Sequence, residues 1–248
     1  MRVTTQAYVL RRVRWSESSL ILTLYSLDLG RISVMAKGAL RPRSSFYGAL
    51  EVLSLTEVTL SRREGREIDT LTEASVVRGN DGLRADPLAF AHACLLAEWV
   101  LGLVYGTEPS QPVFHLLDRS VAMLAAGEAD GWPVVCAAVE RLLRLSGFGM
   151  ETEVCVCCGR PAGGRPGWRP ESGGVVCEAC GGGAKVPAGF LSWVRRSRDS
   201  GLPEMARIRL WPGGFGQCHD IMRSFAEAQL GSALKLRSLA VVEDLENG

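Results

Sequence analysis

Long apolar segments are missing from this sequence. No run reaches the roughly 18 apolar residues that a membrane-spanning helix needs. The first residues also lack the apolar stretch of a signal peptide, so export is not expected. We therefore expect a cytoplasmic protein, in which the eight cysteines are free thiols or metal ligands rather than disulfides. Neither an internal repeat nor a low-complexity tail is present.

Catalytic motifs are also missing. The chain contains no G-x-x-x-x-G-K-[ST] phosphate loop, no H-E-x-x-H zinc motif and no G-x-S-x-G nucleophile turn. Neither C-x-x-C pair follows a proline, as a zinc deaminase would require. Histidine is scarce: His92 and His115 lie in apolar segments that are expected to be helical, and the third is His219. We therefore expect that the protein is not an enzyme.

The composition that remains is typical of a globular protein. Of the 248 residues, 47% are hydrophobic and 22% are charged. This length suits one large domain or two small ones. Almost all of the positive charge is carried by arginine, because only three of the 28 cationic side chains are lysine.

The charge is unevenly distributed along the chain. The total is only +1, yet residues 1–45 hold eight basic side chains and two acidic ones. Residues 81–150 hold four basic and eight acidic side chains. Clustered charge sets the local field whatever the total charge is, so we expect a binding surface for anions near the N-terminal end. A solvated basic face without a ligand is the alternative.

The first 80 residues carry the pattern of β-strands. Runs rich in Val, Ile, Leu and Thr, several of them alternating apolar and polar residues, are separated by short turn signals. Five short strands joined in this way favour a small closed or nearly closed β-barrel. An OB-fold and an SH3-like barrel both fit, because periodicity does not separate them. The expected strands are residues 7–15, 19–27, 31–40, 51–61 and 67–77.

The pattern becomes helical after residue 80. Asp86 is a capping residue followed by Pro87 at the first helical position, and an apolar run continues from there to Gly102. We predict an α+β fold, with a barrel domain at residues 1–80 and a helical domain at residues 81–248. Further helices are expected between Ser110 and Gly127 and at residues 133–145, 191–200 and 218–230.

A glycine-rich insertion at residues 151–186 contains most of the cysteines. Cys177 and Cys180 form a C-x-x-C pair, and Cys155 and Cys158 form another with the same spacing. The 18 residues between the pairs fall within the C-x2-C-x15–20-C-x2-C pattern of zinc sites. Four thiolates fill a tetrahedral site and leave no open position for a substrate. We therefore predict one structural Zn²⁺ ion per chain.

The other cysteines have weaker claims as ligands. Cys157 lies between two predicted ligands and could compete with them. Cys94 and Cys136 are expected to be ordinary core residues of apolar helices. Cys218 precedes His219, but an isolated pair is a weak metal signal. A pair of disulfides, or unliganded thiols, is the alternative to the zinc site.

Residues 35–48, MAKGALRPRSSFYG, combine cations, small residues and two aromatics around one turn. Phosphates could be neutralised by the cations, while Phe46 or Tyr47 could offer a ring on which a base stacks. Alternatively, both rings are buried in the barrel core. The cations of this segment are Lys37, Arg41 and Arg43.

Short segments spread over most of the chain occur in an order that is typical of one family. They are Ala7-Tyr8-Val9-Leu10, Glu17-Ser18-Ser19-Leu20, Gly30-Arg31-Ile32, Ala36-Lys37-Gly38-Ala39, Arg41 through Ser44, Gly48-Ala49-Leu50, Leu71-Thr72-Glu73-Ala74, C-x-x-C-G at 155–159, Gly173-Gly174 and Lys235-Leu236-Arg237-Ser238-Leu239. Together they resemble the RecO family of recombination mediators. The additional Cys157 and the near absence of lysine depart from the family pattern.

The resemblance implies an N-terminal OB-fold followed by an α-helical domain with an inserted four-cysteine, zinc ribbon-like element. It also implies binding of single- and double-stranded DNA and annealing of complementary strands without nucleotide consumption. With its partner RecR, such a protein helps to load RecA onto DNA coated by single-strand-binding protein. Its location would be the cytoplasm, in association with the nucleoid.

Annealing requires a surface that neutralises two phosphate backbones and leaves the base edges free. The basic cluster of Arg195 and Arg196 with Arg198 either extends such a surface or is the solvated face of a helix. The alternatives to DNA binding are an adaptor, in which the barrel and the zinc ribbon dock other proteins, and a zinc-supported hydrolase or transferase. The candidate DNA-binding residues are Arg11, Arg12, Arg14, Lys37, Arg41, Arg43, Arg195 and Arg196.

Overall fold

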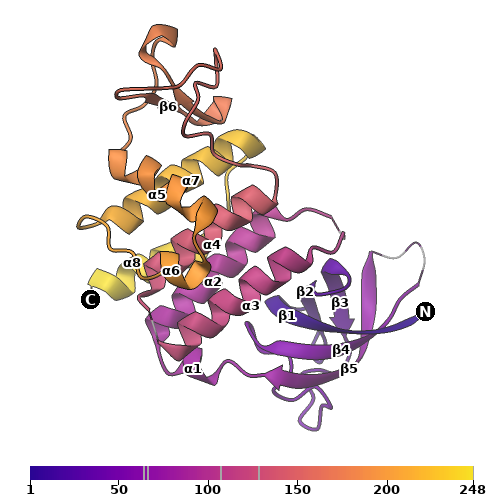
Figure 1. Ribbon diagram of the computed structural model, residues 1–248. Helices are drawn as coiled ribbons and strands as arrows, with labels where there is room; N and C mark the ends of the chain where they lie inside the picture. Colours follow the sequence, from indigo (N-terminus) through magenta and orange to yellow (C-terminus); the bar gives the residue numbers. More distant parts are fainter. Residues whose placement is uncertain (64, 66, 107, 128, 248) are drawn as a thin grey trace. The chain divides into compact units, whose positions relative to one another are not determined.

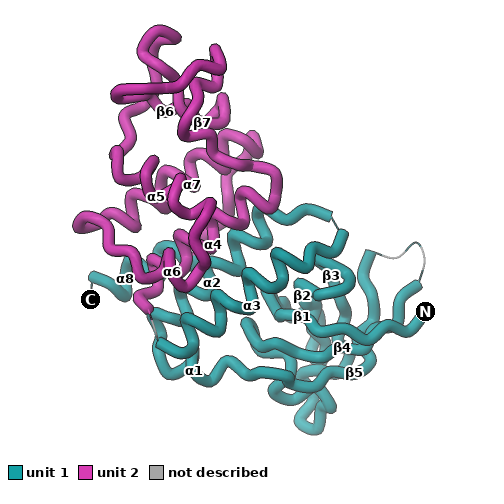
Figure 2. The backbone as a smooth tube through the Cα atoms, viewed as in Figure 1, with its two compact units in different colours: residues 1–127, 238–248 teal, residues 128–237 magenta. Residues whose placement is uncertain are grey.

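The chain has an α+β structure, with a five-stranded N-terminal sheet followed by helices, as predicted (Figure 1). Its internal contacts divide it into two compact units: unit 1 is residues 1–127 with 238–248, and unit 2 is residues 128–237 (Figure 2). In the part of the chain that is described, no helix is both long enough and apolar enough to cross a membrane. The computed structural model describes residues 1–63, 65, 67–106, 108–127 and 129–247.

The five strands of unit 1 form a closed barrel. They are β1 (Arg2–Arg14), β2 (Leu20–Ser26), β3 (Gly30–Ala36), β4 (Leu55–Ser61) and β5 (Ile68–Arg78). Around the barrel their order is β1-β2-β3-β5-β4. The pairing of β3 with β5 is parallel, and the other pairings are antiparallel.

β1 closes the barrel by pairing with two strands. Its first half pairs with β4 and its second half with β2. A register shift between Val9 and Arg11 marks a bulge, and a bulge bends a strand and increases its twist. The strand begins at Arg2, five residues before the predicted start. Pairing on both sides leaves β1 without the free edge that an open sheet would expose.

The barrel interior is filled by alternate side chains of the strands. The burial of β3 alternates residue by residue along its whole length, so one face points into the core. Phe46 and Leu50 join this core from the segment that connects β3 to β4. β3 ends at Ala36, four residues before the predicted end, because a series of turns begins at Lys37.

Strand direction places two connections at one end of the barrel. β1, β3 and β5 run in one direction, and β2 and β4 run in the opposite one. The β1–β2 turn at residues 15–19 and the β3–β4 segment at residues 37–54 therefore lie at the same end. A hydrogen bond from the Leu40 amide to the Ser18 carbonyl, 3.0 Å long, joins these two connections directly.

Helices complete unit 1. Asp86 caps α2, because its Oδ1 accepts hydrogen bonds from the amides of Leu88 at 2.9 Å and Ala89 at 3.1 Å, with Pro87 at the first position as predicted. Gly127 ends α3 with a φ of 63°. The helices are α1 (Asp81–Arg84), α2 (Pro87–Leu103), α3 (Gln111–Ala126) and α8 (Arg237–Asn247).

The barrel is fastened to α2 and α3 by polar side chains. The Tyr8 hydroxyl donates to Oδ1 of Asp118 at 2.8 Å, and Nη1 of Arg31 donates to the Leu101 carbonyl at 2.8 Å. Burial, together with the bond to Asp118, raises the pKa of Tyr8, so the phenol remains a donor. Unit 1 thus continues past residue 80. The assignment of residues 1–80 and 81–248 as functional domains stays a prediction.

Unit 2 is a helical core with a small two-stranded sheet. α4 packs against α5, α6 and α7. Trp168, on the first strand of the sheet, packs against the rings of Phe190 and Phe225, with ring centroids 5.8 and 5.7 Å away. The elements are α4 (Gly131–Leu145), β6 (Gly167–Arg169), η1 (Pro170–Ser172), β7 (Gly174–Val176), η2 (Glu178–Cys180), α5 (Ala188–Asp199), α6 (Leu202–Met205) and α7 (Gly214–Leu230).

Candidate metal centre and candidate nucleic-acid surface

Two turns of unit 2 bring four cysteines together. The Sγ atoms of Cys155, Cys158, Cys177 and Cys180 all lie within 4.8 Å of one another. Those of Cys158 and Cys177 are 3.8 Å apart. A tetrahedron with metal–sulfur bonds of about 2.3 Å has edges of about 3.8 Å. The four predicted ligands are therefore close enough to hold a metal ion.

Each turn closes on a glycine. In the first turn, the Gly159 amide donates to the Cys155 carbonyl at 2.8 Å, and in the second the Gly181 amide donates to the Glu178 carbonyl at 3.1 Å. Gly159 and Gly181 have φ values of 71° and 65°, a backbone conformation that residues other than glycine rarely adopt. The Val156 amide donates to the carbonyl of Val175 in β7, so the sheet positions the first turn beside the second.

Two thiols of the cluster have pKa values that are shifted in opposite directions. Hydrogen bonds from the backbone amide of Cys177, and then from those of Cys157 and Cys158, lower the pKa of Cys155 to about 6. In contrast, hydrogen bonding to Cys158 and to the other thiols raises the pKa of Cys180 to about 12. Four thiolates this close repel one another, and a divalent cation between them would remove that repulsion.

The remaining cysteines lie outside this cluster. Cys157 is exposed, and Nη1 of Arg169 lies 3.4 Å from its Sγ. Burial raises the pKa values of Cys94 and Cys218 to about 12, as expected for core thiols. Among the described residues, the four cysteines are the one group of three or more possible metal ligands, and Cys218 belongs to no such group.

The predicted phosphate-binding cations lie on consecutive turns between β3 and β4. The Arg41 amide donates to the Gly38 carbonyl at 3.1 Å, and the Ser44 amide donates to the Arg41 carbonyl at 3.0 Å. These turns leave Lys37, Arg41 and Arg43 exposed. Nowhere in the described ranges does a carboxylate pair with any of these three side chains. We call this part of the barrel, residues 15–19 and 37–54, the basic end.

The three predicted DNA-binding arginines in the second half of β1 differ in their partners. Arg11 is exposed. Arg14 is also exposed, but its guanidinium donates to the carbonyls of Ser16 at 3.3 Å and Glu17 at 3.5 Å within the β1–β2 turn. Arg12 is only partly exposed and forms an ion pair, described next. The structure therefore leaves the three side chains unequally available to a ligand.

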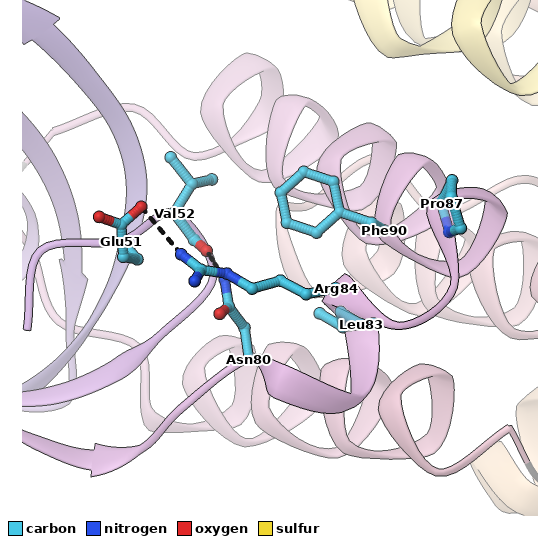
Figure 3. A pocket seen from close by; sticks show the side chains of 7 residues that line it. All are labelled: Glu51, Val52, Asn80, Leu83, Arg84, Pro87 and Phe90. Carbon is cyan, nitrogen blue, oxygen red and sulfur yellow. Dashed lines mark hydrogen bonds and ion pairs between the residues drawn. The ribbon is translucent and has the colours of Figure 1, made fainter. Parts of the chain in front are cut away.

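Glu51 neutralises two arginines beside the basic end. Its Oε2 lies 2.8 Å from Nη1 of Arg12 and 3.1 Å from Nη2 of Arg84. Figure 3 shows Arg84 reaching toward Glu51 across a pocket of about 360 Å³, whose lining also includes Phe90. In the same view, the Asn80 side chain donates to the Val52 carbonyl. These contacts hold α1 against the β3–β4 segment.

The basic cluster on α5 has partners inside unit 2. Arg195 donates to the Thr152 carbonyl, and Nη2 of Arg198 donates to the Met150 carbonyl at 2.9 Å. Arg196 pairs with Glu204 at 3.5 Å. Two of these arginines thus hold the backbone where the cysteine insertion begins. All three side chains are also exposed, and the DNA-binding role of Arg195 and Arg196 stays a prediction.

The two adjacent aromatics of the β3–β4 segment point in different directions. Phe46 is 7% exposed and belongs to the barrel core, whereas Tyr47 is 93% exposed. Trp15, which the sequence pattern assigned to the end of a strand, lies beyond β1 in the β1–β2 turn and is 66% exposed. Its position between Arg14 and the polar run Ser16-Glu17-Ser18 was the sequence signal that could have identified Trp15 as an exposed turn residue.

Comparison with known proteins gives consistent matches over most of the chain. Residues 1–80 match the family model described as Recombination protein O N terminal, and residues 84–238 match Recombination protein O C terminal. A protein named DNA repair protein RecO from Anaeromyxobacter sp. (strain K) is 33% identical over 95% of this chain and 94% of that protein. A protein of the same name from Rhodopirellula baltica is 37% identical over 70% of this chain and 65% of that protein. Another, from Rubrobacter xylanophilus, is 32% identical over 83% of this chain and 84% of that protein.

Proposed function

The chain belongs to the RecO family of DNA repair and recombination proteins, and on this premise we propose that it binds single- and double-stranded DNA and anneals complementary strands. We further propose that, with RecR, it assists the loading of RecA onto DNA coated by single-strand-binding protein. The activity would consume no nucleotide and would take place in the cytoplasm at the nucleoid. The chain itself would act as a DNA-binding mediator rather than as an enzyme.

One observation carries the proposal: the basic end presents three cations that no carboxylate of the described residues neutralises. Lys37, Arg41 and Arg43 lie on turns of an exposed segment, and their charges are available to phosphates. Contacts of this kind attract any nucleic-acid backbone and do not read sequence. A surface with these properties suits annealing, because it can hold two repelling backbones and leave the base edges free to pair.

The barrel supports the assignment of an OB-fold. Five strands in the order β1-β2-β3-β5-β4, with β3 parallel to β5, form a small barrel whose connections cluster at its ends. OB-folds bind oligonucleotides on such surfaces. We propose that residues 1–80 are the DNA-binding domain and that residues 81–248 are the helical domain, with the insertion at residues 151–186 folded as a zinc ribbon.

The ion that we propose for the four-cysteine cluster is Zn²⁺, bound by Cys155, Cys158, Cys177 and Cys180. Thiolate ligands and four-fold coordination both favour zinc over harder divalent cations. With all four positions taken by sulfur, the ion would stabilise the insertion and would supply no chemistry. Exposed Cys157 would stay outside the coordination sphere.

The predicted DNA-binding cations differ in the effect that we expect from each. Lys37, Arg41, Arg43 and Arg11 are exposed and would supply most of the affinity. Arg12 and Arg14 already have partners, so they would contribute less. Arg195 and Arg196 complete the proposed set, with the smallest expected effect because of their contacts within unit 2.

A strand-annealing assay on the purified protein tests the function directly. Annealing of complementary oligonucleotides should be faster with the protein than without it at low salt, and added nucleotide should make no difference. Because phosphate contacts release counterions, the acceleration should fall steeply as salt is raised. The adaptor alternative would be favoured if annealing is not accelerated at low or high salt and the protein instead binds a protein partner tightly.

A further inference from the structure

Two aromatic side chains stand out from the basic end. Trp15 is 66% exposed and Tyr47 is 93% exposed. Single exposed apolar residues are common and need no explanation. Two large rings on the two connections at one end of a small barrel, the end that also carries three exposed cations, form a more specific arrangement.

The backbone holds both rings in place. The Trp15 amide donates to the Ser19 carbonyl at 3.0 Å, which closes the β1–β2 turn. Tyr47 follows Phe46, which is fixed in the barrel core, and its own amide donates to the Ser44 carbonyl at 3.3 Å. Since Phe46 points inward, its neighbour is directed to the solvent. Both rings are therefore presented by turns that are anchored before any ligand binds.

The two turns belong to one surface. The Leu40 amide donates to the Ser18 carbonyl, and Leu20 pairs with Ala36 directly beside that bond. This connection places the turn that carries Trp15 against the segment that carries the exposed cations. Rings and cations side by side are the combination that holds single strands, because phosphates bind the charges while successive bases stack on the rings.

We propose that Trp15 and Tyr47 are base-stacking residues that make the basic end discriminate single-stranded from double-stranded DNA. This inference rests on the proposed function and adds the residues that set its specificity. In a duplex, the flat faces of the bases are already stacked on one another and are closed to a side chain. Both kinds of DNA would use the cations, and single strands alone would use the rings.

This arrangement would favour release of the annealed product over release of the separate strands. Separate strands would be held by phosphate contacts and by stacking, with their pairing edges exposed. As a duplex forms, its bases leave the rings, and the product keeps only the phosphate contacts. The annealed product would therefore dissociate more readily than the strands from which it formed.

Binding measurements on four variants test the inference. Fluorescence anisotropy would compare a labelled single strand, a duplex of equal length and a single strand with abasic sites in place of its bases. We expect Trp15→Ala and Tyr47→Ala each to weaken single-strand binding about tenfold, as loss of one stacked base does. Duplex binding should change less than about twofold. Trp15→Phe should remain close to wild type because it keeps a ring.

Tyr105→Ala is the matched control. Tyr105 is 63% exposed, but it follows Val104, whose carbonyl accepts a hydrogen bond from Arg31 near the start of β3, away from the basic end. Its loss should leave all three affinities unchanged. For the abasic strand, wild-type affinity should be lower than that of either single alanine variant for the intact strand, because neither ring can then stack on a base.

The outcomes separate the inference from the function on which it rests. If Trp15→Ala and Tyr47→Ala leave single-strand binding unchanged, or weaken single strands and duplex equally, base stacking is wrong. If Lys37→Glu with Arg41→Glu still weakens binding about a hundredfold in that case, the proposed DNA-binding function stands. A wild-type protein that binds none of the three probes would overturn both.

Discussion

Two clusters of cations, one in each unit, differ in what their side chains bind. Lys37, Arg41 and Arg43 project from turns at the basic end, and their charges have no carboxylate partner in the described ranges. Arg195 and Arg198 on α5 donate to backbone carbonyls at the start of the cysteine insertion. The first cluster is available to a ligand, whereas the second stabilises its own unit. The number of cations in a sequence segment does not distinguish these two situations. What distinguishes them is whether a backbone carbonyl from elsewhere in the chain lies within hydrogen-bonding distance of the cation.

The largest effect is expected from loss of the metal site, which would change unit 2 and leave the basic end of unit 1 intact. Cys158→Ala together with Cys180→Ala should remove one equivalent of zinc, because structural zinc contributes an apparent binding free energy of about 10–16 kcal/mol. The insertion should then exchange its amide hydrogens rapidly, while DNA affinity should change by less than about threefold. Metal analysis, hydrogen exchange and anisotropy measure these effects.

Cys157→Ala is the control for the metal site, since Cys157 lies outside the cluster. It should retain the full equivalent of zinc. Loss of zinc from Cys157→Ala as complete as that from the double variant would contradict the ligand set. A large fall in DNA affinity on loss of zinc would show that the insertion takes part in DNA binding. The contrast between a binding cluster in unit 1 and a structural cluster in unit 2 would then be wrong.

Charge reversal in each cluster compares the two directly. Lys37→Glu with Arg41→Glu should weaken single-strand binding about a hundredfold and reduce the salt slope by about two, because two phosphate contacts become repulsive. Arg195→Glu with Arg196→Glu should weaken it less than about fivefold. Titrations at several salt concentrations measure both quantities. Equal losses from the two pairs would show that α5 carries as much of the DNA surface as the barrel.

The free energy of unfolding should depend more on the α5 cluster than on the basic end, the reverse of what we expect for DNA affinity. Arg198→Ala removes a charged donor from the Met150 carbonyl and should lower the free energy of unfolding by about 1.5–3 kcal/mol. Arg43→Ala, at an exposed turn, should change it by less than about 0.5 kcal/mol. Denaturant unfolding measures both. An Arg198→Ala protein as stable as wild type would remove the structural role that we assign to α5.

The smallest effect concerns acid stability near the α5 cluster. Burial alone would raise the pKa of Glu151, but hydrogen bonds from the amides of Glu153 and Val154, together with the charge of Arg198, lower it below its usual value of 4.5. A depressed pKa contributes stability above pH 4.5 that is lost as the pH falls through the folded-state value.

The expected loss is less than about 1 kcal/mol, because the Glu151 carboxylate is largely exposed to solvent. Glu151→Gln should flatten the decline in unfolding free energy between about pH 5 and pH 3. The matched variant Glu153→Gln, at an exposed neighbour, should leave that decline as it is in wild type. An unchanged decline in Glu151→Gln would assign the acid sensitivity to other carboxylates.

Local patterns were enough to predict most elements and the four-cysteine cluster. Asp86 followed by Pro87 starts α2, and the second C-x-x-C pair identifies which cysteines of the first turn come together. In both cases the residues that decide the structure are close in the sequence, or their spacing is fixed by the chemistry of one ion.

The contacts that decide which cations and rings are available to a ligand could not be predicted from the sequence. Arg195 binds a carbonyl 43 residues away, and no local pattern shows that this acceptor would be there. The sequence also left open whether Phe46 or Tyr47 is buried, because adjacent aromatics on a turn give no periodicity. Trp15 was missed for a related reason: a tryptophan after an alternating strand fits the strand pattern as well as the turn that follows it.

The order of the units along the chain has a consequence for synthesis. Unit 1 consists of residues 1–127 and 238–248, so the whole of unit 2 interrupts it. The Ser238 amide, near the start of α8, donates to Oε2 of Glu98 in α2 at 2.9 Å, and α8 therefore supplies part of the fold of unit 1. On the ribosome, about 110 residues of unit 2 are synthesised before α8 can join the rest of unit 1. The part of the protein that is made first is thus the part that is finished last.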